Sequence, residues 1–387
     1  MTHRETLRLS VPEQIEGRPV TVPIFQTAIF SFDEPAAMAA AMSSPDGAHF
    51  YSGYTNPTSR ALEDAVSALE GGTVALATAS GMGAMNASLF GVLRHGDHVI
   101  AQKAVYGGTS GLLKDLEEQW GIEVTWIAGH DLAEFGAALQ PNSRVLLLET
   151  IANPTGYVPD LPNLLGAAHS AGLTTIVDNT FATPLLCRPI EYGADIVVHS
   201  ATKYLGGHHD LVAGVAVFAE REPYEKAWAQ AIKFGAVIDP FTAWLTLRGL
   251  KTLPLRVQRQ ANTASDIAHR LAVHPAVTAV HHPGLPTHPS HTRASRLLSG
   301  YGGTLSFEVN GDAERFMSGL DLIFRAGSLG GTETVAMHPA STTHRHLQGE
   351  ELRATGVTPQ LVRLAFGLEH PDDLWSDIEQ ALKRLPR

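Results

Sequence analysis

Cysteine is almost absent from this 387-residue chain, which contains only Cys187. A single cysteine excludes an internal disulfide framework and a metal site built from several cysteines. No apolar run reaches the roughly 18 residues of a transmembrane helix, and the opening residues MTHRETLRLSVPEQIEG lack the apolar stretch of a secretory signal. We therefore expect a globular protein of the cytoplasm, with Cys187 as a small core residue.

Charged residues are also scarce, at 17% of the chain, whereas soluble proteins average about 25%. Coiled coils and disordered chains need more charge, so both classes are disfavoured. The net charge is −11, from 28 Lys and Arg against 39 Asp and Glu, and this opposes non-specific binding to nucleic acids. The scarcity fits a surface partly covered by other subunits, although a large domain with a small surface-to-volume ratio explains it equally well.

Apolar segments that alternate with helical patterns begin after Asn56. Leu62, Ala65, Val66 and Leu69 recur at helical spacing, and a second helix is expected over 82–93. The expected strands cover 73–79, 97–101, 123–127, 144–149, 174–178, 195–199 and 214–218. This alternation predicts an α/β fold with a mostly parallel sheet covered by helices.

Three regions are expected along the chain. Residues 1–55 are interrupted by prolines and are predicted to form an N-terminal arm that contacts a neighbouring subunit. Residues 56–244 are expected to form the large domain, and residues 245–387 a smaller α+β domain. In the smaller domain we expect helices at 263–273 and 372–385 and strands near 277–281, 304–309 and 322–326.

Three polar segments follow predicted strands, at the edge where parallel sheets bind ligands. Asp178 ends one strand, Ser200-Ala201-Thr202-Lys203 follows the next, and Ser80-Gly81-Met82-Gly83 opens a helix. The last segment suits a phosphate, because small residues let backbone N–H groups converge at a helix N-terminus. A dinucleotide loop is disfavoured, since a third glycine and an acid about 20 residues later are both missing.

Together these residues match the needs of pyridoxal phosphate (PLP). Lys203 supplies an amine for a Schiff base, Asp178 pairs with a protonated ring nitrogen, and Ser200 and Thr202 join the phosphate loop. A lysine just after a strand is more often a surface residue, so it is the neighbours of Lys203 that favour catalysis. A PLP-free Schiff-base enzyme and a PLP-binding pseudoenzyme are the alternative classes.

The segment VDNTFATPLLCRPIEYGADIVVHSATKYLGGHHD, residues 177–210, resembles the signature of the Cys/Met-metabolism PLP-dependent family. This family includes methionine γ-lyase, cystathionine γ-lyase, cystathionine γ-synthase and O-acetylhomoserine sulfhydrylase. Further matching motifs are ATASGMGAM at 77–85, VYGGT at 105–109, ETIANPTG at 149–156, AGSLGGTETVAMHPASTTH at 326–344 and LVRLAFGLEHPDDL at 361–374. The resemblance implies the type I aminotransferase-like fold, pyridoxal 5'-phosphate as cofactor, and a homo-oligomer that is at least a dimer and usually a tetramer.

The resemblance also implies roles for individual residues. Lys203 is expected to bond to the cofactor and to move protons between substrate carbons, while Asp178 keeps the ring nitrogen protonated and Tyr106 stacks on the ring. The phosphate is expected to be held by Ser80, Gly81, Met82, Ser200 and Thr202 of the same chain. Tyr51 of the partner subunit is expected to reach the same phosphate. Asn153 is expected near the ring hydroxyl.

Substrate binding is expected at two further positions. Arg363 binds the substrate carboxylate in a planar, bidentate manner, and Ser328 orients Lys203 and the substrate. These groups suit γ-elimination or γ-replacement on a sulfur-containing or homoserine-derived amino acid. Methionine γ-lyase-like elimination, with release of a 2-oxo acid and ammonia, is favoured over replacement on an O-acyl- or O-phosphohomoserine by a thiol.

Three glycines stand where relatives often carry other side chains. Gly53 replaces an arginine that reaches a neighbour's phosphate, which predicts weaker PLP binding, and Arg60 is expected to be a solvated helix residue rather than a substitute. Gly327 replaces the glutamate with which cystathionine enzymes read a distal amino group, and Gly108 replaces a cysteine of methionine γ-lyases. No subfamily fits completely, and Gly327 leaves room for an unusual substrate or nucleophile.

Histidine is abundant, with 19 residues, and His208, His209 and Asp210 look like a metal triad. A Gly-His-x-Asp segment of the family occupies this place, so we expect a structural role and no metal site. Several of the 36 glycines, at 107–108, 206–207 and 330–331, fall around the expected cofactor.

Overall fold

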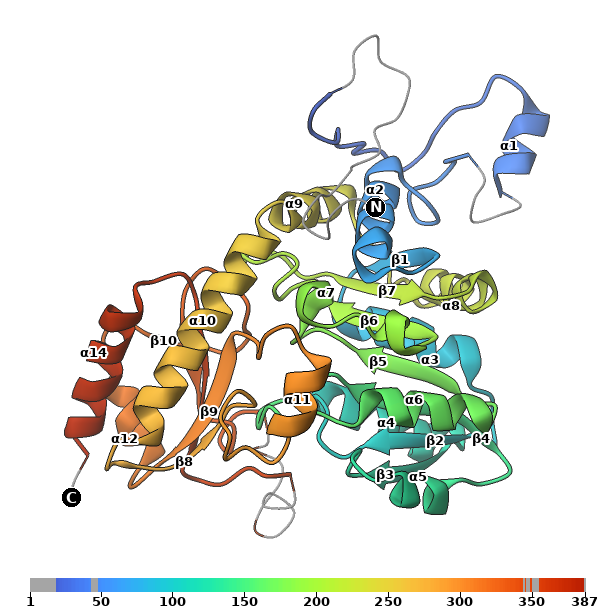
Figure 1. Ribbon diagram of the computed structural model, residues 1–387. Helices are drawn as coiled ribbons and strands as arrows, with labels where there is room; N and C mark the ends of the chain where they lie inside the picture. Colours follow the sequence, from blue (N-terminus) through green and yellow to red (C-terminus); the bar gives the residue numbers. More distant parts are fainter. Residues whose placement is uncertain (1–18, 43–47, 344, 346–348, 350–354, 386–387) are drawn as a thin grey trace.

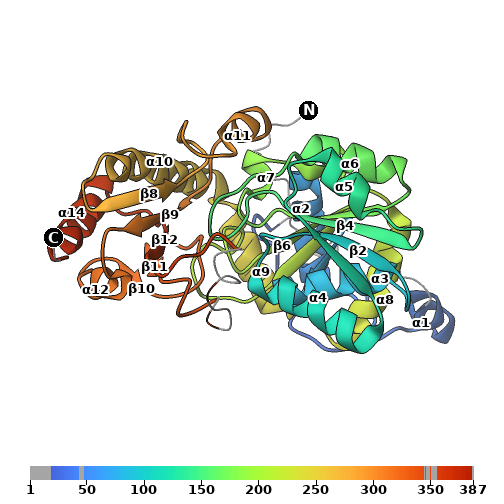
Figure 2. The ribbon, with the colours of Figure 1, turned by 90° about the horizontal axis from the view of Figure 1, so that it is seen from below.

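The computed structural model describes residues 19–42, 48–343, 345, 349 and 355–385, so parts of the predicted arm, 1–18 and 43–47, lie outside the described residues. Within these ranges, a seven-stranded sheet formed by residues 74–218 lies beside a five-stranded sheet formed by residues 277–365 (Figures 1 and 2). The domain boundaries expected near 56 and 245 stay predictions, although each sheet falls within one of the two expected domains.

The first sheet has the strand order β1-β7-β6-β5-β4-β2-β3. Its strands are β1 (Val74–Thr78), β2 (His98–Gln102), β3 (Glu123–Ile127), β4 (Ser143–Glu149), β5 (Thr174–Asp178), β6 (Ile196–Ser200) and β7 (Gly214–Phe218). β7 pairs antiparallel with β1 and β6, and the other pairings are parallel. The predicted mostly parallel sheet is confirmed, and each expected strand bound is within one residue of the observed one.

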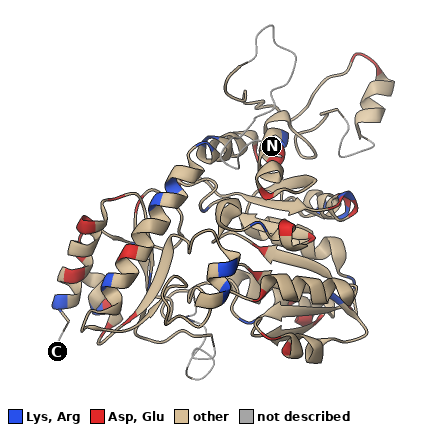
Figure 3. Ribbon diagram, in the orientation of Figure 1, with Lys and Arg blue, Asp and Glu red and all other residues tan. Residues whose placement is uncertain are grey.

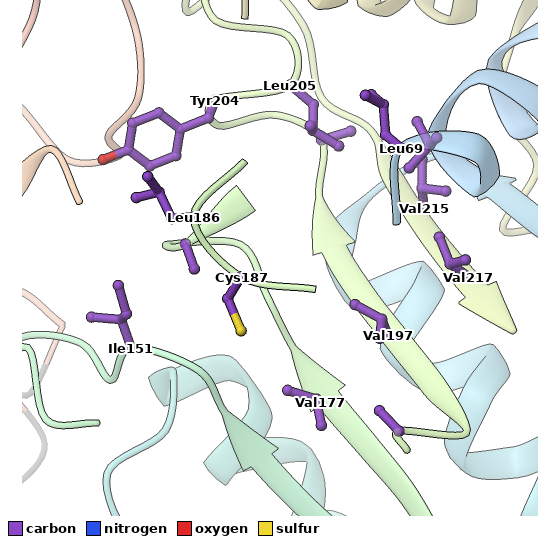
Figure 4. Close-up of a cluster of buried hydrophobic side chains, with 14 of the residues drawn as sticks. Leu69, Ile151, Val177, Leu186, Cys187, Val197, Tyr204, Leu205, Val215 and Val217 are labelled. Atoms are coloured by element: carbon purple, nitrogen blue, oxygen red, sulfur yellow. The ribbon is translucent and has the colours of Figure 1, made fainter. Parts of the chain in front are cut away.

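Helices cover both faces of this sheet (Figure 1). One face buries apolar side chains against α3 (Gly81–Val92), α4 (Gly107–Trp120) and α8 (Arg221–Phe234). The other face is covered by α2 (Pro57–Glu70), α5 (Leu132–Ala138), α6 (Leu161–Ser170), α7 (Thr183–Leu186) and α9 (Pro240–Leu250). Cys187 lies in this second core beside Leu186 and Val177, as the sequence predicted (Figure 4).

Local sequence explains the bounds of α2. Asn56 caps the helix by accepting the N–H of Thr58 at 2.9 Å, and Pro57 supplies a first helical residue that needs no N–H partner. Gly71 ends the helix with a φ of 81°, a left-handed conformation that glycine adopts without a Cβ clash. Glu70 is thereby placed at the end of the last turn, next to the sheet.

The second sheet has the order β10-β11-β12-β9-β8. Its strands are β8 (Val277–His281), β9 (Thr304–Val309), β10 (Phe324–Arg325), β11 (Val335–Met337) and β12 (Leu361–Ala365), and α10 (Leu253–Ala272), α12 (Ala313–Ser318) and α14 (Pro371–Lys383) pack against it. The strand expected at 322–326 is only two residues long, and the helix expected at 263–273 is the second half of α10. β11 and β12 were not predicted as strands.

The described part of the arm packs on its own chain. Phe25 donates its N–H to Thr58 Oγ1 at 2.9 Å, and Trp244 Nε1 donates to the Val22 carbonyl at 3.0 Å. The arm also contains α1 (Pro35–Met42), and the remaining short elements are η1 (Pro189–Tyr192) and α11 (His291–Leu297). None of the described helices is both long and apolar enough to cross a bilayer.

Candidate active site

The predicted cofactor residues gather at the carboxyl edge of the first sheet. β1, β5 and β6 run in the same direction, because β7 is antiparallel to both β1 and β6, and β5 is parallel to β6. Ser80, Asp178 and Ser200 therefore end or follow strands at one edge. Open parallel sheets bind ligands beyond this edge.

The N-terminus of α3 forms one side of the site. Ser80 caps the helix, since its Oγ accepts the Gly83 N–H at 3.0 Å. A Cβ at Gly81 would lie 2.8 Å from the Cβ of Ser200, so glycine allows a close approach that a larger residue would prevent. The first-turn N–H groups of a helix lack intrahelical acceptors and favour an anion. Gly81, Met82 and Ser200 are therefore placed to surround a phosphate.

Lys203, Ser328, Arg363 and Asn153 form a chain of hydrogen bonds. Lys203 Nζ donates to Ser328 Oγ at 2.9 Å. The Arg363 guanidinium donates to the Ser328 carbonyl at 2.6 Å and to Asn153 Oδ1 at 2.9 Å. Arg363 lies on β12 and Lys203 follows β6, so the site lies where the two sheets meet.

Ser328 occupies an unusual backbone conformation at the centre of this chain. Its φ is 71°, which is uncommon for a residue other than glycine. Such conformations cost free energy and cluster at functional sites. Here the conformation presents both the hydroxyl and the carbonyl of Ser328 to charged partners.

Two carboxyl groups lie side by side at the sheet edge. Asp178 at the end of β5 is in register with Glu149 at the end of β4. Burial raises the pKa of Asp178, while hydrogen bonds from Thr180 and the charges of His199 and Lys203 oppose the rise. Burial and the neighbouring Asp178 charge raise the pKa of Glu149 well above its ordinary value. Because like charges at close range repel, the pair binds a proton more readily than two isolated carboxyl groups would.

Of the two cationic side chains of the site, Arg363 is buried and Lys203 is half-buried. Burial and the charge of Arg363 lower the pKa of Lys203, and Asp178 opposes this effect. A lowered pKa increases the share of neutral amine, which is the nucleophilic and basic form. Burial lowers the pKa of Arg363 to about 10, so the guanidinium stays charged at neutral pH. Arg363 Nε is buried without a partner in the described residues, which leaves a donor for a carboxylate.

Tyr106 approaches the site from the N-terminus of α4. Its backbone N–H donates to Glu149 Oε1 at 2.5 Å, and its side chain is 46% exposed. A Cβ at Gly108 would overlap the Tyr106 ring and lie 3.2 Å from Met82 Sδ, so the missing side chain lets the ring lie near the phosphate loop. No role was predicted for Glu149 from the sequence, although an acid at the end of the strand SRVLLLE, directly after the apolar residues VLLL, was a usable signal.

Tyr51 and Thr202 make local contacts of their own. Tyr51 is 44% exposed and forms an isolated antiparallel β-bridge with Ile29. Its ring lies edge-on to the ring of Tyr54. Thr202 Oγ1 donates to the Ala213 carbonyl at 3.2 Å and accepts the Ala213 N–H at 3.0 Å. In the described chain, no hydrogen bond or ring contact joins Tyr51 to Lys203.

The surroundings of the unusual positions differ. A Cβ at Gly53 would overlap the Tyr51 ring, whereas a Cβ at Gly327 would meet no described atom within 4 Å. Arg60 forms an ion pair with Glu63 Oε2 at 3.0 Å, and its guanidinium lies 3.4 Å from the Tyr224 hydroxyl. The prediction of a solvated Arg60 is wrong, because the side of α2 that carries Glu63 is buried.

The donor set fits PLP. The Lys203 amine, whose pKa is lowered, suits the aldehyde, the carboxyl group of Asp178 suits a protonated ring nitrogen, and the cradle between Gly81 and Ser200 suits the phosphate. The described residues contain no group of three or more His, Cys, Asp or Glu side chains arranged to hold a metal ion.

Residues 5–383 match the family described as Cys/Met metabolism PLP-dependent enzyme. The chain is 42% identical over 375 residues to L-methionine gamma-lyase from Pseudomonas putida, covering 96% of this chain and 94% of that protein. Cystathionine gamma synthase from Xanthomonas oryzae pv. oryzae, solved with aminoacrylate and cysteine, has a TM-score of 0.89 at 36% identity, covering 94% of this chain and 93% of that one.

A structure from Campylobacter jejuni subsp. jejuni that contains N'-pyridoxyl-lysine-5'-monophosphate has a TM-score of 0.94 at 29% identity. The match covers 99% of this chain and 100% of that one. The similarity of these structures confirms the fold that the sequence predicted.

Proposed function

Because the chain belongs to the Cys/Met-metabolism PLP-dependent enzyme family, we propose that it acts as a methionine γ-lyase-like enzyme. The reaction converts L-methionine and water into methanethiol, 2-oxobutanoate and ammonia. The observation that carries this proposal is the hydrogen-bonded chain from Lys203 through Ser328 to the buried Arg363, which joins a reactive amine to a carboxylate-binding group.

In this proposal Lys203 holds the cofactor, and Asp178 pairs with its ring nitrogen. Tyr106 stacks on the ring, and Asn153 lies near the ring hydroxyl. The phosphate is held by Ser80, Gly81, Met82, Ser200 and Thr202 of the same chain, together with Tyr51 of the partner subunit. The close approach of Gly81 to Ser200 supports the phosphate position.

Arg363 fixes the substrate before any bond changes. Its buried guanidinium binds the α-carboxylate, and the bonds to Asn153 and Ser328 prevent it from rotating away. A carboxylate bound at Arg363 has its Cα near Lys203, because Ser328 contacts both side chains. Positioning of this kind supplies a large part of enzymatic rate acceleration.

PLP, when bound, supplies an electron sink that stabilises negative charge at the substrate Cα. Lys203 removes the Cα proton, which its lowered pKa favours because the amine is then more often neutral. Ser328 Oγ holds the amine in place, and Lys203 carries protons between substrate carbons. Tyr106 is half-exposed and assists protonation of the leaving group.

A second candidate function is γ-replacement on an O-acyl- or O-phosphohomoserine with a thiol. The observation that favours it is the open space at Gly327, where a side chain would meet no described atom. That space accommodates a larger activated side chain or a specialised nucleophile. Cystathionine is a less favoured substrate, because Gly327 has no charge with which to bind a distal amino group.

We also propose that the enzyme is a homo-oligomer, at least a dimer and more often a tetramer, in the cytoplasm. Exposed apolar side chains such as Val20, Ile29 and Leu255 support a covered surface. The regions 1–55, 56–244 and 245–387 act in it as arm, cofactor domain and smaller domain.

A substrate panel tests the proposed reaction. Purified enzyme is incubated with L-methionine, L-cystathionine, L-cysteine, and O-acetyl-, O-succinyl- and O-phosphohomoserine, each with and without a thiol. We expect 2-oxobutanoate from methionine whether or not a thiol is present. Thioether formation from an activated homoserine, without release of 2-oxobutanoate from methionine, would favour the second candidate. No turnover of any substrate by a PLP-loaded enzyme would leave the pseudoenzyme as the better description.

A further inference from the structure

Four buried polar side chains meet on the far face of the first sheet, below the cofactor residues. Glu70 Oε1 accepts hydrogen bonds from His199 Nε2 at 2.6 Å and from Asn179 Nδ2 at 2.7 Å. Asn179 Nδ2 also donates to the Cys187 carbonyl at 2.9 Å, and Asn179 Oδ1 accepts from Thr150 Oγ1 at 2.8 Å. Each of the four side chains is at most 1% exposed. We call Glu70, Thr150, Asn179 and His199 the far-face clamp.

Three members of the clamp lie at the ends of β4, β5 and β6, and each is the chain neighbour of a residue at the site. Thr150 follows Glu149, Asn179 follows Asp178, and His199 precedes Ser200. Successive side chains of a strand point to opposite faces, so these neighbours lie on opposite faces of the sheet. The clamp therefore holds the backbone that presents the site residues.

The backbone of the three strand ends is tied together at the same level. Thr150 N–H donates to the Asp178 carbonyl at 3.0 Å, and Asn179 N–H donates to the Val198 carbonyl at 2.9 Å. On the near face, Thr180 completes the link, because its N–H donates to Asp178 Oδ1 at 2.9 Å and its Oγ1 accepts the Ser200 N–H at 2.8 Å. A shift of Asn179 would thus move Asp178 and Ser200 together.

The clamp buries polar side chains in an apolar core, which costs free energy of folding. Leu69, Val177, Val197 and Val215 belong to the apolar core on that face (Figure 4). Glu70 Oε2 is buried and has no partner in the described chain. Well-packed apolar residues often stabilise a core as much as buried charged groups do. Core stability alone therefore gives no reason for a carboxylate at this position, whereas alignment of strand ends does.

We propose that Glu70 is a positioning residue that, through Asn179 and His199, holds the ends of β5 and β6 so that Asp178 and Ser200 stay aligned with the cofactor. The inference rests on the proposed roles of Asp178 and Ser200. Glu70 itself lies on the face opposite to α3 and the phosphate loop.

The variant Glu70→Gln probes the clamp with little change in volume. A glutamine keeps one oxygen that can accept both bonds, but the bonds lose their charge assistance, and an NH2 donor stands where Glu70 Oε2 is now buried without a partner in the described chain. The variant therefore weakens the clamp, and the strand ends gain freedom. His98→Gln is a matched control, since His98 is equally buried and bonded to Ser143 Oγ and Thr125 Oγ1, but lies at the opposite, amino end of β2.

The readouts are the dissociation constant of PLP and the visible absorption of bound PLP across pH, with thermal unfolding of each PLP-free protein for comparison. We expect PLP to bind about tenfold more weakly to Glu70→Gln, with a shifted pH dependence of the absorption. His98→Gln should lower the unfolding temperature without changing either cofactor readout.

Unchanged PLP binding and absorption in folded Glu70→Gln would overturn the proposal, as would equal weakening in both variants. If Glu70→Gln does not fold, Thr150→Val removes only the bond to Asn179 Oδ1, and wild-type cofactor binding in that variant would equally overturn it. Failure of the wild-type enzyme to bind PLP would instead contradict the proposed function, so the two outcomes are distinguishable.

Discussion

At the level of single residues, the site depends on Lys203 being partly buried and close to the like charge of Arg363. The amine is held by Ser328 Oγ, and its pKa is lowered by burial and by Arg363. Lys203→Ala removes the group that we propose attaches the cofactor and carries protons. We expect a turnover below about 10⁻³ of the wild-type rate. Steady-state rates and visible absorption measure this, and a normal rate would refute the role of Lys203.

Asp178 offers a second residue-scale test, because Asn has the same shape without the charge. Asp178→Asn keeps a hydrogen-bond acceptor for the Thr180 N–H, so the fold should persist. We expect turnover to fall about 100-fold or more, since a neutral amide does not hold the ring nitrogen protonated. PLP should still attach to Lys203, which absorption spectra would show. A wild-type rate would contradict the assignment of Asp178.

Gly53 gives a prediction in the opposite direction. An arginine at this position would add a charge-assisted contact to a phosphate, worth about 1.5–3 kcal/mol. The Tyr51 ring now overlaps the place of a Cβ at Gly53 and must rotate, which reduces the gain. We expect Gly53→Arg to bind PLP about tenfold more tightly, as measured by cofactor titration. Gly53→Ala is the control, because it displaces the same ring without adding charge, and an equal effect of both variants would exclude the charge as the cause.

Individual reactive residues were predictable because they stand in contiguous motifs such as Ser200-Ala201-Thr202-Lys203. The residues that contact or position them could not be predicted in this way. Glu149 acquires its role from register with Asp178 on the next strand, and Glu70 from a contact with His199 that spans 129 positions. Such pairings depend on strand order, which periodicity along the chain does not contain.

At the level of elements, the loop between β8 and α11 concentrates buried histidines near the site. His282 is fully buried and accepts the Gly284 N–H at 3.2 Å, and His288 lies 3.1 Å from the Thr155 carbonyl. Ser306 Oγ donates to the Pro154 carbonyl at 2.7 Å from β9. The loop and β9 thus support the segment that carries Asn153, which explains part of the histidine content without a metal.

Because of the buried His282 in this loop, we expect the free energy of unfolding to fall in acid. Burial, with smaller effects of His288 and His269, lowers the pKa of His282 to about 3 from an ordinary value of 6.5. Between these values the unfolded chain binds a proton that the folded chain does not, so stability falls as pH drops below about 6.5, by about 1.4 kcal/mol at pH 5.5. Denaturant unfolding at pH 7.5 and 5.5 measures the loss.

His282→Asn should reduce this acid-dependent loss, even if the variant is less stable overall. The Asn side chain retains an oxygen acceptor for the Gly284 N–H but does not titrate. His130→Asn, at an exposed position, serves as the control. An unchanged difference between pH 7.5 and pH 5.5 in His282→Asn would show that other groups cause the acid sensitivity.

Most strands of the first sheet were predictable because they are short apolar runs bounded by turns and buried on both faces, although the edge strand β3 is more exposed. The strands of the second sheet were harder to predict from the sequence. β11 has three residues, and β12 carries the buried Arg363 in its centre, so neither resembles an isolated apolar strand. Arg363 has its place there because Asn153 and Ser328 satisfy its guanidinium, a tertiary effect that overrides local preference.

At the level of the whole molecule, charge is sparse over the described elements, and much of the ribbon carries neither sign (Figure 3). Apolar side chains are exposed on the arm, including Val20 and Ile29, and elsewhere on the chain, including Val212 and Phe241. The arm also carries Tyr51. A surface of this kind suits contact with a second copy of the chain. The composition alone left subunit contact and domain size as equal explanations, and these exposed side chains favour subunit contact.

The position of Tyr51 on this surface gives a test of oligomerisation that involves the site itself. If Tyr51 serves the site of the partner subunit, Lys203→Ala and Tyr51→Ala subunits have complementary defects. In a mixed dimer, one site then contains both defects, and the other contains both an intact Lys203 and an intact Tyr51. Random mixing makes half of the dimers mixed, so about a quarter of all sites should be wild type. Co-refolding or co-expression followed by activity per subunit measures this fraction.

Each parent should have little activity alone, and light scattering should give at least a dimer for both. Recovery of activity on mixing requires that residues from two chains form one site, because no exchange of whole subunits repairs a defect confined to one chain. If Tyr51 acts within its own chain, every subunit in the mixture keeps one defect, and activity stays at the average of the two parents. The mixing experiment therefore distinguishes an arm that merely covers apolar surface from an arm that completes the neighbouring site.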